Sequence, residues 1–472
     1  MSDPLWEFDA AVAAMQGEVT GTVPQALTEV SIDSRTLAQG SLFVAIRGER
    51  LDGHDYVAAA FEAGAGAAVV ARDAALGDTI GPLIRVDDTL VALDALGRAA
   101  RARTDATVIA VTGSVGKTGT KEGLRLALGP SGVTHVSEKS YNNQWGVPLS
   151  LSNMESATRF GVFEVGMNSP GEIVPLSRMI RPHVAVVTTV EPVHIEFFRS
   201  TEQIAEAKAE IFQGLEPDGT AILNKNNPHF ALLAERAQEA GAGRIVAFGA
   251  DPAADARLED ITLGPDGSDV SAVIDGTPVR YRVGAAGRHL VMNSLAVLAA
   301  VQVAGGDLMA GAAALSAYSA PKGRGERNLI RLADGAVNLI DESYNANPAS
   351  MRAALAAMAQ TPRSDFPRRI AVLGDMLELG EAGSELHGAL ADPVDAAGVD
   401  VVFACGPQMA TLYEALPEAR RGAHAPNSAE LEGPLLAAVR AGDVVMVKGS
   451  LGSRMGPLVE ALKAHLSEQG GG

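Results

Sequence analysis

The sequence predicts an α/β protein with three domains and mainly parallel sheets. Short apolar runs rich in β-branched residues alternate with alanine-rich helical stretches, which is typical of parallel strands joined by helices. The length of 472 residues favours roughly three domains, at about 150 residues each. Three systems of strand, loop and helix follow one another along the chain.

The first system covers residues 1–86. Two runs, SLFVAIRG and GAAVVA, have the apolar character of buried strands, and the segment HDYVAAAFEAGA between them has helical composition. We expect these residues to form an N-terminal domain.

The second system covers residues 87–319 and begins with a helix, TLVALDALGRAARAR. A strand, a glycine turn and a helix follow in VIAVTGSVGKTGTKE, Val108 to Glu122. Within residues 250–286, apolar and polar residues alternate in SAVIDGTPVRYRV, which predicts a small β insert.

The third system covers residues 320–472. It contains the strand-like runs VNLID, RRIAVLG and VDVVFACG, and later DVVMVKGS. The preceding stretch SAPKGRGERN, Ser319 to Asn328, has the composition of a linker. We expect a C-terminal domain after it.

Charge and cysteine content limit the classes of function. The chain has 38 basic and 57 acidic residues, a net charge of −19, and no basic runs, which argues against a nucleic-acid partner. The lone Cys405 excludes an internal disulfide and suits a reducing compartment.

The stretch MSDPLWEFDA carries early acids and no apolar core, and no run of about 18 apolar residues occurs. We therefore expect a cytoplasmic protein without a signal peptide or membrane span.

The glycine turn predicts a phosphate-binding loop. Val108 to Thr112 suit a buried parallel strand, Gly113 to Gly116 form the turn, and Lys117 and Thr118 begin a helix. The N–H groups and the dipole of such a helix start favour an anion, Lys117 would reach the terminal phosphates, and the Thr118 hydroxyl would ligate Mg²⁺. The usual pattern G-x-x-x-x-G-K-[ST] has a glycine where this chain has Val111. The alternative is an ordinary glycine turn.

Further candidate ligands follow neighbouring strands. Glu164 lies within the apolar run of RFGVFEVGMNSPGE, where a carboxylate is disfavoured unless it is paired or bound to a metal. The alternative for Glu164 is the solvent face of an edge strand. His194 and Glu196 lie just past another apolar run, in VAVVTTVEPVHIEFF, and loops in this position bind ligands in open α/β sheets. A lone histidine can equally be an ordinary surface or core residue.

Lys208 lies on or beside the apolar face of a predicted helix. The segment STEQIAEAKAEIFQGL begins at Ser200, and Ser200 and Gln203 have the spacing of a capping box. No residue three or four positions from Lys208 is acidic, so a helical ion pair is not available. Periodicity alone favours a lysine that snorkels to solvent. The alternative is a desolvated, neutral amine that adds CO₂ and holds Mg²⁺ as a carbamate.

These motifs resemble those of the Mur ligase family of peptidoglycan synthesis, in which the shorter GxxGKT loop is normal. The resemblance covers essentially the whole chain. It runs through SIDSRTLAQGSLFVAIRGERLDGHDY, VTGSVGKTGTKE, SYNNQWGVPLSL, FEVGMNSPGEI, AEAKAEIF, GRHLVMNSLAV, GRGERNLI, IDESYNANPASM, AVLGDMLELG and MVKGS. Three motifs, YNNQ-GVP, SYNANP-SM and LGDMLELG, are specific to the branch that joins D-alanyl-D-alanine to UDP-N-acetylmuramoyl-tripeptide.

The resemblance implies three domains and a set of site residues. Residues 1–86 would bind the UDP end of the sugar nucleotide, residues 87–319 would bind ATP, and residues 320–472 would form a Rossmann-like domain that binds the amine substrate. The nucleotide contacts implied are Gly113, Ser114, Val115, Gly116, Lys117, Thr118, Gly119, Asn293 (at the adenine), Arg324 and Asp341. The substrate contacts implied are Ser34, Arg35, His54, Asn142, Asn143, Asn345, Asn347, Lys448 and Ser450.

The resemblance also implies the cofactors and the reaction. ATP would react with the help of two Mg²⁺ ions, one on Thr118 and Glu164 and the other on His194 and a carbamylated Lys208. The γ-phosphoryl group would pass to the tripeptide carboxylate, and the D-alanyl-D-alanine amine would attack the acyl phosphate, leaving ADP and phosphate. The third residue of the tripeptide stays open between diaminopimelate and lysine. We expect a monomer.

The chain departs from the family pattern at two positions. Trp145 follows YNNQ where an aliphatic residue or Phe is expected, and Leu451 follows KGS where an arginine is common. Both changes concern contacts to the acceptor substrate rather than the reaction.

Three other functions compete with this interpretation. A ligase that adds a single amino acid such as meso-diaminopimelate, or a folylpolyglutamate synthetase, is disfavoured by SYNANPASM. A GTPase switch is suggested by LNKNN, but Asn227 stands where the guanine-reading motif needs a carboxylate, and Asn224 to Asn227 suit a turn after a strand. A non-catalytic ATP-binding scaffold is disfavoured by the intact set of Lys117, Glu164, His194 and Lys208.

Overall fold

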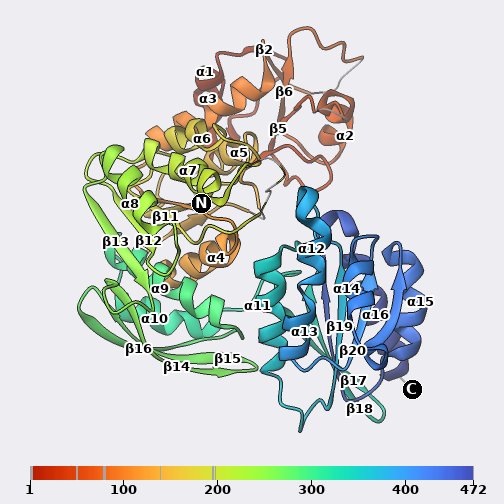
Figure 1. The fold of residues 1–472 in the computed structure, drawn as a ribbon. Helices are drawn as coiled ribbons and strands as arrows, with labels where there is room; N and C mark the ends of the chain where they lie inside the picture. Colours follow the sequence, from red (N-terminus) through yellow and green to blue (C-terminus); the bar gives the residue numbers. More distant parts are fainter. Residues whose placement is uncertain are drawn as a thin grey trace.

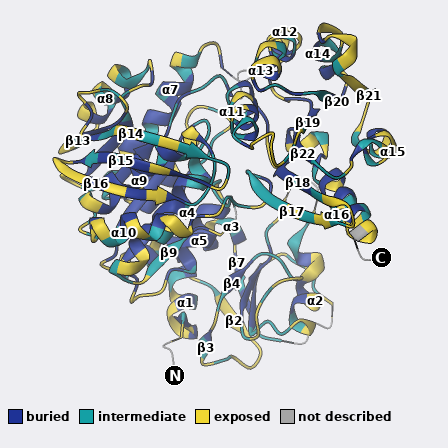
Figure 2. Cartoon of the chain, turned by 90° about the horizontal axis from the view of Figure 1, so that it is seen from below, coloured by how far each residue is buried: buried dark blue, intermediate teal, exposed yellow. Residues whose placement is uncertain are grey.

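The computed structural model describes residues 4–48, 51–77, 81–138, 140–193, 196 and 198–470. The α/β class is confirmed, because the chain forms three lobes that each surround a mainly parallel sheet (Figure 1). The inner strands of the sheets and the inward faces of the covering helices are buried, whereas strands at the sheet edges are partly exposed (Figure 2). In the described part of the chain, every helix is too short or too polar to span a membrane.

The N-terminal lobe has a five-stranded sheet in the order β2-β7-β6-β5-β4 and a separate pair, β1 and β3. Its elements are β1 (Trp6–Glu7), α1 (Phe8–Met15), β2 (Glu18–Thr20), β3 (Ala26–Leu27), β4 (Val30–Ser31), β5 (Leu42–Val44), α2 (Val57–Glu62), β6 (Ala67–Ala71) and β7 (Leu83–Val86). Side chains of α1 and of α3 (Thr89–Ala102) pack on one face of the sheet, and α2 packs on the other.

The central lobe has a nine-stranded sheet in the order β16-β15-β14-β13-β12-β11-β8-β10-β9. Its strands are β8 (Thr107–Thr112), β9 (Thr134–Val136), β10 (Phe160–Glu164), β11 (Val184–Val187), β12 (Thr220–Asn224), β13 (Arg244–Gly249), β14 (Ala256–Gly264), β15 (Gly267–Ile274) and β16 (Thr277–Val283). Its other helices are α4 (Lys117–Leu128), α5 (Gly146–Ser152), α6 (Ile173–Ile180), α7 (Thr201–Ala209), α8 (Phe230–Glu239), α9 (Arg288–Val303) and α10 (Leu308–Ala314). Helices α4, α9 and α10 cover one face, and α5 to α8 cover the other.

The order of these strands places a ligand site at the end of β8. The chain runs from β8 through β9 to β10 on one side and then crosses to β11 on the other, so β8 has a parallel neighbour on each side. A crevice outside the carboxyl ends of the strands is expected at such a reversal. The predicted β insert is not separate, because β14 to β16 continue this sheet with antiparallel pairing.

The C-terminal lobe has a six-stranded sheet in the order β17-β18-β22-β19-β20-β21, parallel except for β17. Its elements are β17 (Glu326–Leu332), β18 (Gly335–Glu342), α11 (Pro348–Ala359), β19 (Arg368–Gly374), α12 (Gly383–Gly388), α13 (Ala391–Ala396), β20 (Val401–Cys405), α14 (Met409–Ala415), β21 (Arg421–Ala425), α15 (Ser428–Ala438), β22 (Asp443–Lys448) and α16 (Gly456–Gly470). The predicted linker is therefore too long, because its last three residues begin β17.

The two junctions between lobes differ in kind. The core of the N-terminal lobe continues into the central lobe at Leu149, and the indole N–H of Trp6 donates to the Ser152 carbonyl oxygen at 2.8 Å. Among the described residues, no hydrophobic cluster includes side chains from both the central and the C-terminal lobes. These two lobes contact through polar groups, such as Arg324, which donates to the Ser140 hydroxyl at 3.2 Å.

Candidate active site

A cleft of about 530 Å³ lies between the central and C-terminal lobes. It is lined by the loop after β8, the ends of β10 and β11, the first turns of α4 and α9, and the start of α11. The predicted residues that line it are Ser114, Val115, Gly116, Lys117, Thr118, Gly119, Asn142, Glu164, Asn293, Arg324, Asn345, Asn347 and Lys448. The crevice is thus at the position that the strand order indicates.

The loop after β8 has a shape that requires two of its glycines. Gly113 has φ +149°, and a Cβ there would collide with the Thr188 hydroxyl. Gly116 has φ +87° and caps α4, and a Cβ there would lie 2.7 Å from Asn293 Nδ2. The Thr188 hydroxyl also donates to the Val115 carbonyl oxygen at 2.6 Å. The neighbouring strand therefore fixes the loop, and the N–H groups at the start of α4 face an anion site.

Lys117 lies back over this loop. Its ammonium donates to the Gly113 carbonyl oxygen at 2.7 Å. Burial lowers the pKa of Lys117, the nearby Glu164 carboxylate opposes this shift, and the Arg324 guanidinium adds to it. Two cations from different lobes thus meet at one wall of the cleft, where a polyanion would relieve their repulsion.

Glu164 ends β10 and is 1% exposed, so the solvent-face alternative is wrong. Its carboxylate accepts hydrogen bonds from the Thr118 hydroxyl at 2.9 Å and from Asn142 Nδ2 at 2.7 Å. Hydroxyl and carboxylate oxygens are the ligands that Mg²⁺ prefers. His194 lies outside the described residues, and within them no cluster of three His, Cys, Asp or Glu side chains could hold a metal.

Lys208 is 4% exposed, so the snorkelling interpretation is wrong. No described residue donates to, accepts from or forms an ion pair with its amine. Burial, and then the charge of Lys117, hold the pKa of Lys208 well below its usual range. The predicted capping box is half formed, because Ser200 accepts from the Gln203 N–H at 3.2 Å while the Gln203 side chain accepts from the Arg199 N–H at 2.9 Å.

The C-terminal lobe contributes a buried ion pair to the opposite wall. The Lys448 ammonium lies 3.1 Å from a Glu342 carboxylate oxygen and donates to the Asn345 carbonyl oxygen at 2.9 Å. Asn347 caps α11, because its side-chain oxygen accepts from the Ser350 N–H at 2.9 Å. The Arg324 guanidinium stacks 4.0 Å from the Tyr344 ring centroid.

Several predicted residues do not line the cleft. Asp341 is 1% exposed and accepts from the Ser343 hydroxyl at 2.6 Å, and its neighbour Glu342 lines the cleft instead. Successive side chains of a strand point to opposite faces, which explains why Glu342 lines the cleft and Asp341 does not. Ser450 is buried between Leu377 and Ala346, to which it is hydrogen-bonded. The other predicted residues outside the lining are Gly113, Asn143, Lys208, Ser34, Arg35 and His54.

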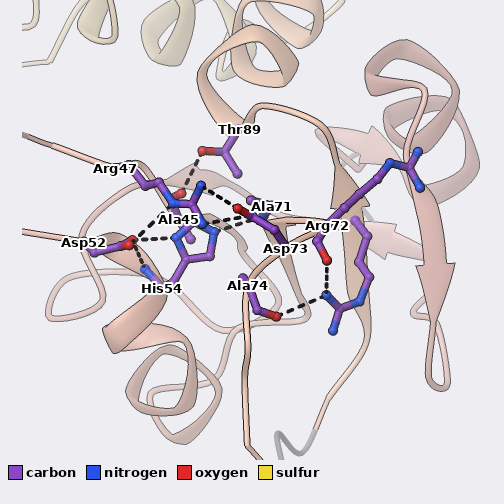
Figure 3. Close-up of polar contacts among 10 residues, drawn as sticks. Ala45, Arg47, Asp52, His54, Ala71, Arg72, Asp73, Ala74 and Thr89 are labelled. Carbon is purple, nitrogen blue, oxygen red and sulfur yellow. Dashed lines mark hydrogen bonds and ion pairs between the residues drawn. The ribbon is translucent and has the colours of Figure 1, made fainter.

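Of the predicted residues of the N-terminal lobe, His54 lies in a local polar network (Figure 3). His54 Nδ1 lies 2.5 Å from an Asp52 carboxylate oxygen, and its Nε2 accepts from the Ala71 N–H at 2.9 Å. Both ring nitrogens are thus engaged within the lobe, and a ligand contact would replace one of these bonds. Arg35 is exposed and forms an ion pair with Asp33 at 2.7 Å, and this contact raises the pKa of Arg35. Ser34 lies between them in sequence and is half-buried.

The cleft residues that were not predicted from the sequence include Thr188, His289, Tyr318 and Glu342. Burial lowers the pKa of His289, and Glu342 and Lys448 act on it in opposite directions. An acidic neighbour of Asp341 was visible in IDESYNANP, but no signal marks the other three. The stretch LNKNN, which resembles a guanine-reading motif, runs from the end of β12 into a turn, as predicted. Asn227 Nδ2 donates a hydrogen bond to the Val190 carbonyl oxygen of the neighbouring loop at 2.9 Å.

Comparison with protein families gives three consecutive matches. Residues 26–103 match the model described as "Mur ligase family, catalytic domain". Residues 111–301 match "Mur ligase middle domain", and residues 323–451 match "Mur ligase, glutamate ligase domain". Together the matches reach into all three lobes.

Curated relatives and solved structures match over nearly the full chain. UDP-N-acetylmuramoyl-tripeptide–D-alanyl-D-alanine ligases are 34% identical in Bacillus subtilis, over 92% of this chain and 92% of that protein, and 33% identical in Escherichia coli, over 96% and 97%. A crystal structure of MurF from Acinetobacter baumannii has 29% identity and a TM-score of 0.82, covering 97% of this chain and 99% of that one. MurF ligase from Thermotoga maritima in complex with ADP has 25% identity and a TM-score of 0.76, over 93% and 98%.

Proposed function

Because the chain belongs to the Mur ligase family, we propose that it joins D-alanyl-D-alanine to UDP-N-acetylmuramoyl-tripeptide in a reaction driven by ATP. The product is a precursor of peptidoglycan. One observation carries the proposal: a single cleft brings the phosphate loop of one lobe to face Lys448 and Asn345 of another. Such a cleft lets a phosphorylated carboxylate meet an amine.

ATP takes the wall formed by the loop after β8. Gly113 to Gly119 surround the phosphates, Lys117 reaches the transferred phosphoryl group, and Asn293 and Arg324 contact the rest of the nucleotide. The paired cations at this wall and the ADP bound to the Thermotoga maritima relative support this placement. Asp341 is buried outside the lining of the cleft, so it would act on the nucleotide only through its neighbours, and the adjacent Glu342 lines the cleft paired with Lys448.

The oxygen ligands of the cleft fit Mg²⁺. Thr118 and Glu164 would hold one ion, and His194 with a carbamylated Lys208 would hold the second. Bound there, the ions would reduce repulsion between the anionic reactants and stabilise charge on the phosphoryl group. The carbamate is supported by the burial and lowered pKa of Lys208, since only a neutral amine can add CO₂, with release of a proton.

The chemistry has two steps. A carboxylate oxygen of the tripeptide attacks the γ-phosphorus, the bond to ADP breaks, and an acyl phosphate forms. The amine of D-alanyl-D-alanine then attacks the carbonyl carbon, and phosphate leaves with the former carboxylate oxygen. Lys117 and the N–H groups of the loop stabilise charge on the moving phosphoryl group.

The remaining substrate contacts follow from the placement of the lobes. Asn345, Asn347 and Lys448 are proposed for the dipeptide, with Ser450 behind them. Asn142 and Asn143 are proposed for the tripeptide end or the intermediate. The UDP end is proposed for the N-terminal lobe near Ser34, Arg35 and His54. The proposed domains are residues 1–86, 87–319 and 320–472, and we propose a monomer that acts in the cytoplasm.

The proposal is tested by ATP-dependent phosphate release with each component omitted in turn. We expect release only when UDP-N-acetylmuramoyl-tripeptide and D-alanyl-D-alanine are both present, and GTP should not replace ATP. Release with meso-diaminopimelate in place of the dipeptide would assign the chain to a sister activity. Running the assay with a diaminopimelate-containing tripeptide and with a lysine-containing tripeptide also identifies the third residue of the tripeptide that the protein uses.

A further inference from the structure

Tyr318 is a buried aromatic residue at the edge of the nucleotide cleft. It lies just before the chain crosses from the central lobe to β17, and its backbone N–H donates to the Leu315 carbonyl oxygen at 3.1 Å. The side chain is 5% exposed and belongs to the core that α4, α9 and α10 cover. It also lines the cleft beside Gly119 and Asn293. The ring is therefore fixed by the core while its edge faces the cleft.

The hydroxyl of Tyr318 has no hydrogen-bond partner among the described residues. Buried polar groups are nearly always paired, so an unpaired hydroxyl on a residue that lines a ligand cleft indicates a contact that the ligand completes when it binds. Burial raises the pKa of Tyr318, and the hydroxyl therefore keeps its proton and can donate it. Tyr281, in the same core, shows the ordinary arrangement, because its hydroxyl lies 2.8 Å from the Ser294 hydroxyl.

The position of the hydroxyl selects a part of the nucleotide. A Cβ on Gly119 would lie 3.1 Å from the Tyr318 hydroxyl oxygen, so this oxygen lies directly against the first turn of α4. Gly119 follows Lys117 and Thr118, the residues assigned to the γ- and β-phosphate end. Because Tyr318 also lines the same cleft as Asn293, which is proposed for the adenine, we assign its hydroxyl to the part of the nucleotide between the β-phosphate and the base.

We infer that the Tyr318 hydroxyl donates a hydrogen bond to an oxygen of the α-phosphate or ribose of the bound nucleotide. Tyr318 is then a nucleotide-binding residue that lies outside the reacting atoms. The inference rests on the proposed function, because it takes ATP as the occupant of the cleft. It also accounts for glycine at position 119, since a side chain there would displace the hydroxyl or the nucleotide.

The test is Tyr318→Phe, which keeps the ring and removes the hydroxyl. Titration calorimetry with Mg²⁺-ADP and with a non-hydrolysable ATP analogue should show dissociation constants raised about tenfold, the scale of one hydrogen bond to a charged group. The KM for ATP should rise similarly, while kcat at saturating ATP changes less than about twofold. The melting temperature without nucleotide should be equal or higher, because an unpaired buried hydroxyl is removed.

Tyr281→Phe is the matched control. It removes a hydroxyl that has a partner, so it should lower the melting temperature and leave nucleotide affinity unchanged. The double variant of Gly119→Ala and Tyr318→Phe adds a second measurement. Gly119→Ala should weaken binding more in the wild-type background than in the Tyr318→Phe background, where the opposing oxygen is gone.

Two outcomes would overturn the inference. Equal nucleotide affinities of wild type and Tyr318→Phe would mean that the hydroxyl makes no contact with the nucleotide. A changed preference between ATP and ITP would mean that it contacts the base, since both nucleotides share the α-phosphate and ribose. A wild-type protein that binds no nucleotide would instead refute the proposed function, so the two failures are distinguishable.

Discussion

The buried amine of Lys208 has a proposed role in catalysis that can be separated from its effect on stability. Lys208→Met keeps the apolar stem and removes the amine. Without the carbamate, we expect phosphate release to fall at least about a hundredfold, while nucleotide affinity in calorimetry changes little. Bicarbonate should not restore the variant, whereas wild type prepared without CO₂ should regain activity when bicarbonate is added. Full activity in Lys208→Met would remove Lys208 from the reaction.

The same variant makes a prediction about pH. Because the pKa of Lys208 is lowered in the folded state, the unfolded chain binds one more proton between that lowered pKa and 10.5, so this group destabilises the fold increasingly as pH falls. In CO₂-free buffer, Lys208→Met should therefore melt at a higher temperature than wild type near pH 7. The difference should shrink as pH approaches 10.5. A difference that is constant between pH 7 and pH 10 would contradict the burial of an ionisable amine.

The conformation of Gly113 predicts a sharp effect of a single methyl group. With φ +149° and the Thr188 hydroxyl in the way, Gly113→Ala must distort the phosphate loop. We expect nucleotide affinity to fall about tenfold or more, as measured by calorimetry. Gly129→Ala, at the end of the same helix with nothing within 4 Å of the added Cβ, is the control and should bind normally.

For single residues, the sequence predicts the chemical role of a side chain better than the direction in which the side chain points. The buried pairing of Glu164 with Thr118 follows from a carboxylate in an apolar strand beside a phosphate loop. The choice between Asp341 and Glu342 does not follow, because neighbours on a strand face opposite sides and both are acidic. Tyr318 carries no sequence signal either, since its unpaired hydroxyl is a property of three-dimensional packing.

At the scale of elements, Asn347 has a structural role that can be separated from a role in binding. It caps α11 and also lines the cleft. Asn347→Ala should destabilise the protein by about 1 kcal/mol in urea denaturation, the usual effect of losing a cap. Asn347→Ser keeps a capping oxygen and should restore most of the stability. If the amide also contacts the dipeptide, the KM for D-alanyl-D-alanine stays raised in both variants.

Asn427 supplies the control for this prediction. It caps α15 in the same way, accepting from the Glu430 N–H at 3.0 Å, but it does not line the cleft. Asn427→Ala should show a similar loss of stability with an unchanged KM. A raised KM in Asn427→Ala would mean that loss of a cap alone disturbs the site, and the case for direct contact by Asn347 would fail.

Helices and strands were predictable from the sequence where the hydrophobic pattern and the residues with a special backbone or chemical role indicate the same structure. The strand, turn and helix around the phosphate loop follow from an apolar run, two required glycines and Lys117 at the helix start. The extent of β17 was not predictable, because its first residues, Glu326 to Asn328, continue a stretch of linker composition and become a strand through pairing with β18. The joining of β14 to β16 to the main sheet also depends on pairing, because β14 pairs with β13.

At the scale of the whole molecule, the C-terminal lobe is expected to move. The N-terminal lobe shares its core with the central lobe. In contrast, no hydrophobic cluster of the described residues joins the C-terminal lobe to the central lobe. Hydrogen bonds between these two lobes include Arg324 with Ser140 and the Glu196 N–H with the Glu378 carbonyl oxygen at 3.4 Å. Polar contacts of this kind permit rearrangement between lobes. Closure would exclude water from the acyl phosphate.

Small-angle X-ray scattering measures this movement. The radius of gyration should fall when a non-hydrolysable ATP analogue and UDP-N-acetylmuramoyl-tripeptide are added together. The variant Lys117→Ala, which should bind the nucleotide poorly, serves as the control and should not compact under the same conditions. Unchanged dimensions of wild type with both ligands bound would show that the cleft is already in its working form.

The proposed reaction activates the tripeptide carboxylate as an acyl phosphate and transfers the acyl group to D-alanyl-D-alanine. The most direct measurement starts from tripeptide nucleotide labelled with ¹⁸O in its terminal carboxylate and follows the label by mass spectrometry. We predict one ¹⁸O in each released phosphate and a product heavier than the tripeptide nucleotide by the dipeptide less water. Phosphate without the label, or label transfer that proceeds equally with a single amino acid as the acceptor, would contradict the account.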